Sequence, residues 1–160
     1  MQDADRPAVA EFIERHWHDK KVMSQGRAYY PHEECGILQR NHGELVGVLT
    51  YRVEDGALEI LTLNATVHGS GIGTALMLAA IDKARHAACR RIFLTTTNDA
   101  LRAMRFYQRL GFRMVAVNIG AVDAARVEKP SIPETGEGGI GIHDEILMEL
   151  MVEPYLDGAE

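Results

Sequence analysis

Apolar and polar residues along this chain change their period several times, which predicts a succession of short helices and strands. Apolar residues at helix spacing after Pro7 predict an amphipathic helix over residues 6–18. Two β-rich runs, 36–40 and 45–53, flank an Asn-x-Gly turn, which is typical of a β-hairpin. A further run over 57–64 extends this hairpin into a three-stranded meander.

The middle of the chain has the order strand, glycine turn, helix, strand. A helix is predicted over residues 71–88, and it leads to a β-branched strand over 91–97. Such a strand-helix-strand unit indicates a parallel pair of strands. Asn98 is a good N-cap for a helix over 99–110, and a strand over 112–119 follows. The pattern predicts an α+β domain with a mixed sheet.

The two remaining stretches show weaker patterns. Residues 20–31 have no period and are predicted to form a loop or an irregular helix. Residues 120–142 contain two prolines and five glycines, and we expect a long irregular segment there after a short helical turn at 121–127. A last strand over 143–152 closes the sheet. No internal repeat is visible, so one domain over 1–160 is the expectation.

Composition narrows the class of protein. With 46% hydrophobic and 25% charged residues the chain matches an ordinary soluble globular protein. Its net charge of −6 argues against a nucleic-acid partner. Apolar runs are too short to span a membrane, and the polar start resembles no secretory signal, so a cytoplasmic location is expected. Cys35 and Cys89 are expected to be buried thiols. The histidines form no metal-binding pattern, so no metal is expected, and a homodimer is left open.

The glycine turn before the helix at 71–88 carries the first chemical signal. Three glycines in five positions let the backbone approach an anion closely, and a helix start offers unpaired N–H groups with partial positive charge. A dinucleotide fingerprint needs glycines at its first, third and sixth positions, and a P-loop ends in Gly-Lys-Ser/Thr. The turn His68-Gly69-Ser70-Gly71-Ile72-Gly73-Thr74 satisfies neither pattern.

This turn resembles the pyrophosphate loop of GCN5-related N-acetyltransferases, the GNAT superfamily, with His68 where the family usually has Gln or Arg. A second segment, 98–112, resembles a family motif that contains an Asn, a Phe-Tyr pair and a Gly-Phe pair. The resemblance covers about residues 35–119. It implies the acetyl-CoA N-acyltransferase fold, a mixed central sheet flanked by helices, with acetyl-CoA as cosubstrate.

The resemblance also implies a cofactor site. The acetyl thioester would lie near strand 57–64, where a backbone N–H polarises its carbonyl, and the pyrophosphate would rest on the glycine turn. Asn98 would contact the pantetheine or phosphate arm, although a role as N-cap explains it equally well. The implied cofactor-binding residues are Leu61, Thr62, Leu63, His68, Gly69, Ser70, Gly71, Ile72, Gly73, Thr74 and Asn98.

Two residues are candidates for catalysis. Glu59 matches the Glu of family members with an E-I-x-x-L strand, and a base is needed because an amine with a pKa of ~10 is mostly protonated at neutral pH. The alternative is an exposed carboxylate on a strand face. Tyr107 stands where the family has its general acid, which would protonate the CoA thiolate. The alternative is a tyrosine that packs the helix on the sheet.

The predicted function is N-acetylation of a primary amine by direct attack, with a small molecule as acceptor. Alternatives are a non-catalytic acyl-CoA-binding or sensing module, and an acetyltransferase of protein N-termini or lysines. Residues 27–32 and 129–133 are candidates for the acceptor site, because the ends of the chain form it in this family.

Overall fold

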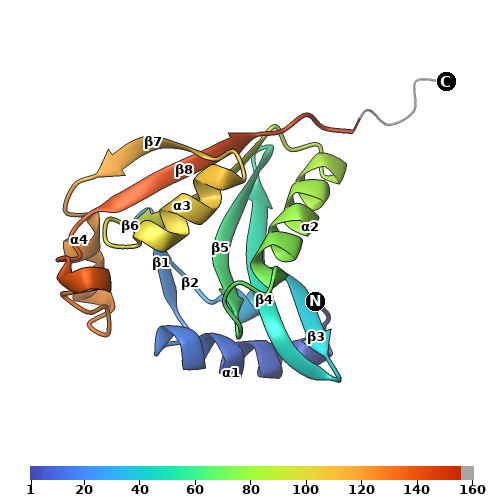
Figure 1. Cartoon of the computed structure of the whole chain (residues 1–160), viewed down its shortest axis with the longest axis horizontal. Helices are drawn as coiled ribbons and strands as arrows, with labels where there is room; N and C mark the ends of the chain where they lie inside the picture. The colour runs from blue at the N-terminus through green and yellow to red at the C-terminus, as the bar shows by residue number, and fades with distance from the viewer. Residues whose placement is uncertain (156–160) are drawn as a thin grey trace. The chain divides into compact units, whose positions relative to one another are not determined.

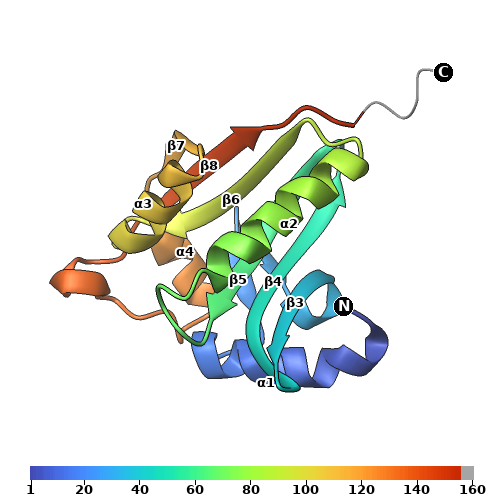
Figure 2. The ribbon, with the colours of Figure 1, turned by 45° about the vertical axis from the view of Figure 1, so that its right-hand side comes forward.

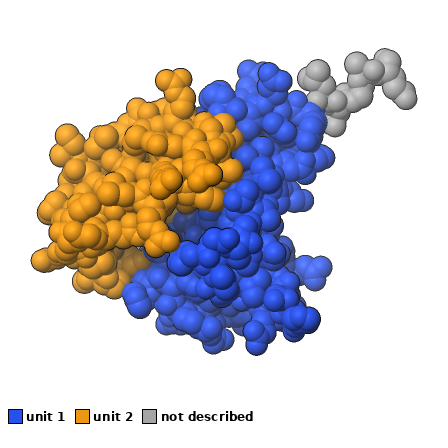
Figure 3. Space-filling model, in the orientation of Figure 1, with its two compact units in different colours: residues 1–22, 30–92, 151–160 blue, residues 23–29, 93–150 orange. Residues whose placement is uncertain are grey.

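The structure is a computed structural model that describes residues 1–155. The chain forms two compact units, shown in different colours in Figure 3. The first contains Met1–Val22, Tyr30–Ile92 and the end of the chain from Met151, and the second contains Met23–Tyr29 and Phe93–Leu150. The organisation as one domain stays a prediction.

An antiparallel meander forms the sheet of the first unit. Its strands are β3 (Cys35–Asn41), β4 (Glu44–Glu54) and β5 (Ala57–Ala65), as the sequence predicts. Two tight turns connect them. Both His42 and Gly43 have positive φ, as do Asp55 and Gly56. Two-residue hairpins favour such turns because their twist matches that of the strands.

Two helices cover opposite faces of this sheet. Val9, Phe12 and Ile13 of α1 (Arg6–Trp17) form a buried cluster with Val48 of β4. The preceding residue of β4, Gly47, faces the other way, and its position lies against Ile72, the first residue of α2 (Ile72–His86). Figure 2 shows α2 along β4 and β5. Two short 3₁₀ helices, η1 (Asp3–Asp5) and η2 (Pro31–Glu33), complete the unit.

A β-bulge in β5 changes which side chains share a face. Thr50 pairs with Thr62, but the next residue, Tyr51, pairs with Ile60, so Leu61 is the extra residue. An extra residue breaks the regular alternation of side chains along its strand. The register therefore places Glu59 on the same face as Thr62, the face covered by α1. Regular alternation would have placed Glu59 on the opposite face.

In the second unit, the strand order is β6-β8-β7. These strands are β6 (Arg91–Thr97), β7 (Arg113–Asn118) and β8 (Glu145–Met151), and β7 pairs with β8 in antiparallel orientation. The helices are α3 (Leu101–Arg109) and α4 (Ala121–Glu128) (Figure 1). A hairpin of β1 (Val22–Ser24) and β2 (Arg27–Tyr29) and the 3₁₀ helix η3 (Glu137–Gly139) complete this part of the chain.

Three predictions about local structure are wrong. Residues 20–31 contain the β1–β2 hairpin instead of a loop or irregular helix, and their turn is Gln25-Gly26, with φ of 48° and 73°. Strands of three residues are too short to show a period. The helix predicted over residues 99–110 begins at Leu101 instead of residue 99. Cys35 is exposed instead of buried, because it begins β3, an edge strand; Cys89 is buried as expected.

The predicted long segment between residues 120 and 142 has more structure than expected. Its first part is α4, and a bridge between Thr135 and Gly141 closes a loop around η3. Arg126 holds this loop, since its guanidinium donates hydrogen bonds to the carbonyls of Ile132 and Ile142, at 3.1 and 2.7 Å. None of the described helices is long and apolar enough to cross a membrane.

Candidate functional site

The glycine turn connects β5 to α2 in the first unit. Gly69 and Gly71 have φ of 75° and 83°, which is the region that favours glycine. A Cβ atom built at either position meets no atom within 4 Å, so the backbone of the turn is open to an incoming group. The Ser70 hydroxyl donates a hydrogen bond to the carbonyl of Val67 at 2.7 Å, which stabilises the conformation of the turn.

The start of α2 has the properties of an anion-binding site. Its N-cap is Gly71, which has no side chain to satisfy the first N–H groups, and its first turn contains no acidic residue. The first N–H bonded to the helix backbone is that of Ala75, to the carbonyl of Gly71 at 2.9 Å. The N–H groups of Gly73 and Thr74 have no acceptor among residues 1–155. Free N–H groups and the helix dipole favour a phosphate here.

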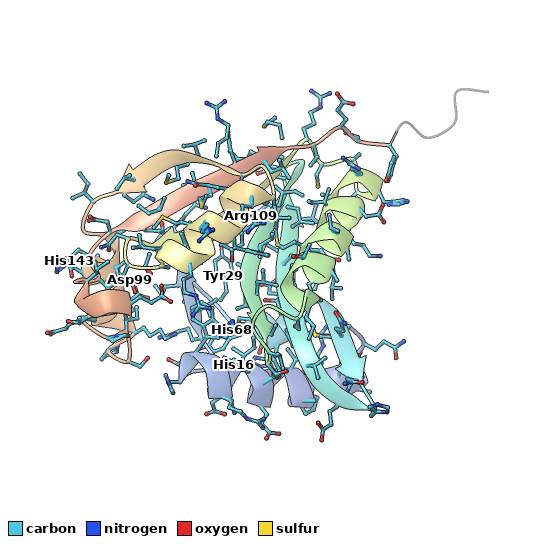
Figure 4. All side chains as sticks on the ribbon, in the orientation of Figure 1. His16, Tyr29, His68, Asp99, Arg109 and His143 are labelled. Atoms are coloured by element: carbon cyan, nitrogen blue, oxygen red, sulfur yellow. The ribbon has the colours of Figure 1, made fainter. Side chains whose placement is uncertain are left out.

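His68 lies in the exposed part of this turn (Figure 4). It shares this exposure with Gly69, Ser70, Gly71 and Thr74, while Ile72 and Gly73 are half-buried. The sequence-predicted pyrophosphate residues thus form one continuous turn and helix start, and the donors present fit a pyrophosphate. Their contact with a cofactor stays a prediction.

The bulge lies within the second predicted contact, residues 61–63. Leu61 and Thr62 are buried, and Leu63 is half-buried. The Thr62 hydroxyl lies 2.7 Å from that of Thr50, which fixes the register just before the bulge. The extra residue of a bulge has no partner on the opposite strand, so the N–H of Leu61 is not needed by β4. Such a donor is what a thioester carbonyl requires.

Glu59 is buried, with 6% of its surface exposed, so the alternative of an exposed strand carboxylate is wrong. The register places Arg52 of β4 directly opposite. Opposite charges at such a cross-strand pair attract each other, which favours keeping a carboxylate at this buried position. The sequence alone does not show that Glu59 shares a face with Thr62, because this depends on the bulge at Leu61.

Tyr107 lies on α3 in the second unit, and its ring packs near Phe106 and Phe112, at 5.3 and 5.9 Å between ring centroids. Burial raises the pKa of Tyr107 to about 12, because the phenolate would lose its hydration there. The side chain is therefore a neutral phenol at neutral pH, as a general acid must be. The packing that the alternative role requires is also present.

Asn98 has a structural role that the sequence does not reveal. Its amide donates to the carbonyl of Gly141 at 2.8 Å, and its side-chain oxygen accepts from the N–H groups of His143 and Asp144, at 2.9 and 3.0 Å. The predicted N-cap role is wrong, because the N-cap of α3 is Ala100 and no side chain caps the helix. Asn98 instead ties the end of β6 to the start of β8.

Sequence reasoning missed the neighbouring Asp99. This carboxylate is buried, and it accepts hydrogen bonds from the Thr97 hydroxyl and, at 3.1 Å, from the N–H of Glu137. Gly136 passes so close that a Cβ atom there would lie 1.8 Å from an Asp99 oxygen. A glycine among several others gives no sequence signal of such a close approach.

The two candidate acceptor segments have different surroundings. Within 129–133, Lys129 is buried, and Arg126 donates to the carbonyl of Pro133 at 3.0 Å. Residues 27–32 divide between the units: Arg27 lies over the ring of Tyr29 in the second, and Tyr30 lies edge-on to His32 in the first. Among the described residues, no three His, Cys, Asp or Glu side chains are grouped as ligands of a metal ion.

The sequence and the fold both have known relatives. The sequence model of the Acetyltransferase (GNAT) family matches residues 3–112. The uncharacterized protein YdhI of Bacillus subtilis is 38% identical over 146 residues, which cover 91% of each chain.

Two solved structures show the fold. A Bacillus subtilis acetyltransferase in complex with CoA superposes with a TM-score of 0.61 at 24% identity, over 71% of this chain and 73% of that one. A GNAT family acetyltransferase from Elizabethkingia anophelis with acetyl-CoA bound gives 0.62 at 24% identity, over 72% and 74%. These likenesses confirm the predicted fold class, and acetyl-CoA is the cosubstrate of acetyltransferases of this family. The chain belongs to the GNAT family of acetyltransferases.

Proposed function

We propose that this chain is an acetyl-CoA-dependent N-acetyltransferase that acetylates the primary amine of a small molecule by direct attack, in the cytoplasm. The observation that carries the proposal is the open glycine turn at the start of α2, a few residues after a bulged strand. In a member of the GNAT family, this pair of features suits a cofactor with a pyrophosphate at one end and a thioester at the other.

The residues present fit acetyl-CoA, which supplies an activated acetyl group as its thioester. The N–H groups of residues 69 to 74 would hold the pyrophosphate, and the backbone at Leu61 to Leu63 would hold the acetyl end. A donor at Leu61 stabilises the negative charge that develops on the carbonyl oxygen during attack. Asn98, beyond its structural bonds, is the proposed contact for the arm of the cofactor.

Glu59 is the proposed base. The attacking amine must lose a proton, and a carboxylate accepts it directly or through a water molecule. Its burial opposite Arg52 keeps the carboxylate in one place on the face that it shares with Thr62. Side-chain entropy that is already lost on folding does not have to be lost again during the reaction.

Tyr107 is the proposed acid. The thiolate of CoA needs a proton as it departs, and the raised pKa of Tyr107, about 12, keeps its hydroxyl protonated at every physiological pH. A covalent acetyl-enzyme is not part of the proposal. Burial raises the pKa of the Cys89 thiol, which keeps it in its unreactive form.

The first test is calorimetric titration of the purified protein with acetyl-CoA and with CoA. We expect saturable binding at one site, followed by release of CoA when suitable amines are supplied. Ser70→Asp adds a negative charge beside the start of α2 that repels the phosphates, so we expect affinity to fall about tenfold. The substitution also removes the hydroxyl that donates to Val67, so the loss of stability is measured separately by urea unfolding. Asn41→Asp is the matched control, because it adds the same charge at an exposed position outside the proposed sites.

Each outcome separates the proposal from its alternatives. Absence of any heat would overturn the cofactor assignment. Binding without CoA release across a wide panel of amines and peptides would support a sensing module, and acetylation of peptides alone would support a protein N-terminal or lysine acetyltransferase.

A further inference from the structure

The chain contains a single tryptophan, Trp17, which is the last residue of α1 and has 40% of its surface exposed. Its indole N–H donates a hydrogen bond to the side-chain oxygen of Asn64 on β5, at 2.7 Å. The two residues are 47 positions apart, so this bond connects the end of the helix to the sheet. An exposed indole that is already held in one orientation is a preformed contact surface, because binding costs it little side-chain entropy.

Asn64 places this indole on the face of β5 that carries the proposed base. Asn64 pairs with Val48, which α1 covers, and Thr62 pairs with Thr50, so Asn64 and Thr62 both lie on the α1 face of the sheet. Glu59 shares this face because of the bulge. Two residues of a strand span about 7 Å, so Asn64 lies about 7 Å along the strand from Thr62. The indole is therefore within reach of the far end of a short acceptor.

The groups at the end of α1 favour a positive charge. The face of an indole attracts a cation, and the C-terminal end of a helix carries partial negative charge. The residue before Trp17 adds an acceptor: Nδ1 of His16 donates to the carbonyl of Phe12 at 2.8 Å, and the imidazole stacks on the Phe12 ring. In the neutral imidazole, Nε2 is then an acceptor. It has no hydrogen-bond partner among residues 1–155.

The formal charges of this part of the chain balance. Residues 11–21 contain three acidic and three basic side chains, namely Glu11, Glu14 and Asp19 against Arg15, Lys20 and Lys21. Arg15 pairs with Glu11 at 2.7 Å, and Lys20 pairs with Glu14 at 3.7 Å. The net charge of the segment therefore neither attracts nor repels a ligand, and the indole, the imidazole and the helix end decide its preference.

We propose, on the basis of the proposed function, that Trp17 determines acceptor specificity and that the acceptor is a diamine. Its second ammonium group binds on the indole of Trp17 while its first amine is acetylated. A spacer of about four to six methylene groups covers the length from Thr62 to Asn64. The acetyl transfer is unchanged: the first amine bonds to the acetyl carbon as the C–S bond breaks, its proton passes to Glu59, and the thiolate leaves protonated as CoA.

The first test is binding, measured by the fluorescence of the single tryptophan. The protein is saturated with CoA and titrated with 1,5-diaminopentane or with pentylamine, which has the same chain and lacks the second charge. We expect a saturable change in the emission of Trp17, with half-saturation by the diamine at a concentration about tenfold below that of pentylamine. Equal half-saturation, or an emission that does not respond to the diamine, would overturn the inference.

The second test is kinetic selectivity, measured as the ratio of kcat/KM for 1,5-diaminopentane to that for pentylamine. Trp17→Leu is expected to lower this ratio about tenfold, mainly through the KM of the diamine, with acetyl-CoA affinity kept. Trp17→Phe keeps an aromatic face and is expected to lower it less, and it serves if Trp17→Leu does not fold. Tyr155→Leu is the matched control, since Tyr155 is also an exposed aromatic of the first unit with one side-chain hydrogen bond, to Asp82 at 3.0 Å.

The outcomes separate this inference from the proposed function. Absence of CoA release with every amine would overturn the function, and the inference with it. Release with diamines and monoamines at equal efficiency would overturn the inference alone. So would a preference for phenylethylamine over the diamine, which would indicate ring stacking on Trp17, and so would an equal effect of Trp17→Leu and Tyr155→Leu on the ratio.

Discussion

Tyr107 has a packed ring, and its burial also keeps its hydroxyl protonated. Tyr107→Phe keeps the ring and removes the proton. We expect kcat to fall about 10²-fold, the size typical of a lost general acid, with little change in acetyl-CoA affinity. Steady-state kinetics and calorimetry check this. Equal losses in kcat and affinity would indicate a packing role instead.

The pKa of Tyr107 also predicts how stability depends on pH. Because the folded state holds the neutral phenol, its pKa of about 12 lies above the ordinary value of 10.0 that applies when the chain is unfolded. The stabilisation is complete below pH 10 and is lost as the pH rises toward 12. Tyr107→Phe should therefore lose less stability over this range than the wild type in urea unfolding. If the free energies of unfolding of the wild type and the variant changed with pH in parallel, Tyr107 would not titrate between pH 10 and 12.

Glu59→Gln removes the charge of the proposed base and keeps its shape. We expect the rate at neutral pH to fall by about 10²-fold or more and to recover as the pH approaches the pKa of the free amine, because an amine that is already deprotonated needs no base. A pH–rate profile that keeps the wild-type shape would remove Glu59 from the mechanism.

At the scale of elements, the contact between β4 and the start of α2 controls the glycine turn. A Cβ atom at Gly47 would lie 2.5 Å from a methyl carbon of Ile72, the first residue of α2. Gly47→Ala must push this helix start away from β4, so we expect a stability loss of about 1–3 kcal/mol and weaker acetyl-CoA binding. In the control Gly36→Ala, the nearest atom belongs to Met1, a terminal side chain that can move.

The link between β6 and β8 is a second prediction at this scale. Asn98→Ala deletes three hydrogen bonds, and we expect a stability loss of about 2–3 kcal/mol in urea unfolding. The affinity for acetyl-CoA distinguishes its two proposed roles. Unchanged affinity in the folded variant would leave Asn98 with a structural role alone, and a loss beyond that of Asn118→Ala, which deletes one bond to Glu145, would support a cofactor contact.

At the scale of the whole molecule, net charge works against binding of an anion. The chain carries −6, yet α3 exposes Arg102, Arg105 and Arg109 and contains no acidic residue. Figure 4 labels Arg109 on this helix. We expect the triple substitution to Gln to slow association of acetyl-CoA about tenfold at low salt, and to flatten its salt dependence. Stopped-flow kinetics check this.

A control variant tests whether α3 matters specifically. Replacing Arg15, Lys20 and Lys83 with Gln changes the net charge by the same amount, on exposed positions of the first unit. If both triple variants slow association equally, the total charge is responsible and the arginines of α3 have no special part.

Element order, the glycine turn and most strand boundaries followed from the sequence, because they depend on local periodicity and on residues with restricted or unusual torsions. The meander is an example: its turns need residues with positive φ, and Gly43 and Gly56 indicate these turns in the sequence. The GNAT assignment followed too, since both motifs lie in continuous segments. The β1–β2 hairpin was not predicted, because a three-residue strand is too short to show a period.

Interactions between distant segments had to come from the folded chain. The bulge at Leu61 sets the face of Glu59, yet it arises from the register between two strands and leaves no local pattern. The partners of Asn98 lie more than forty residues away, and the contact of Gly136 with Asp99 spans a similar separation. A residue's type tells which bonds it is able to make. Which bonds it does make depends on the groups that folding brings within reach, and that is a property of the packed molecule.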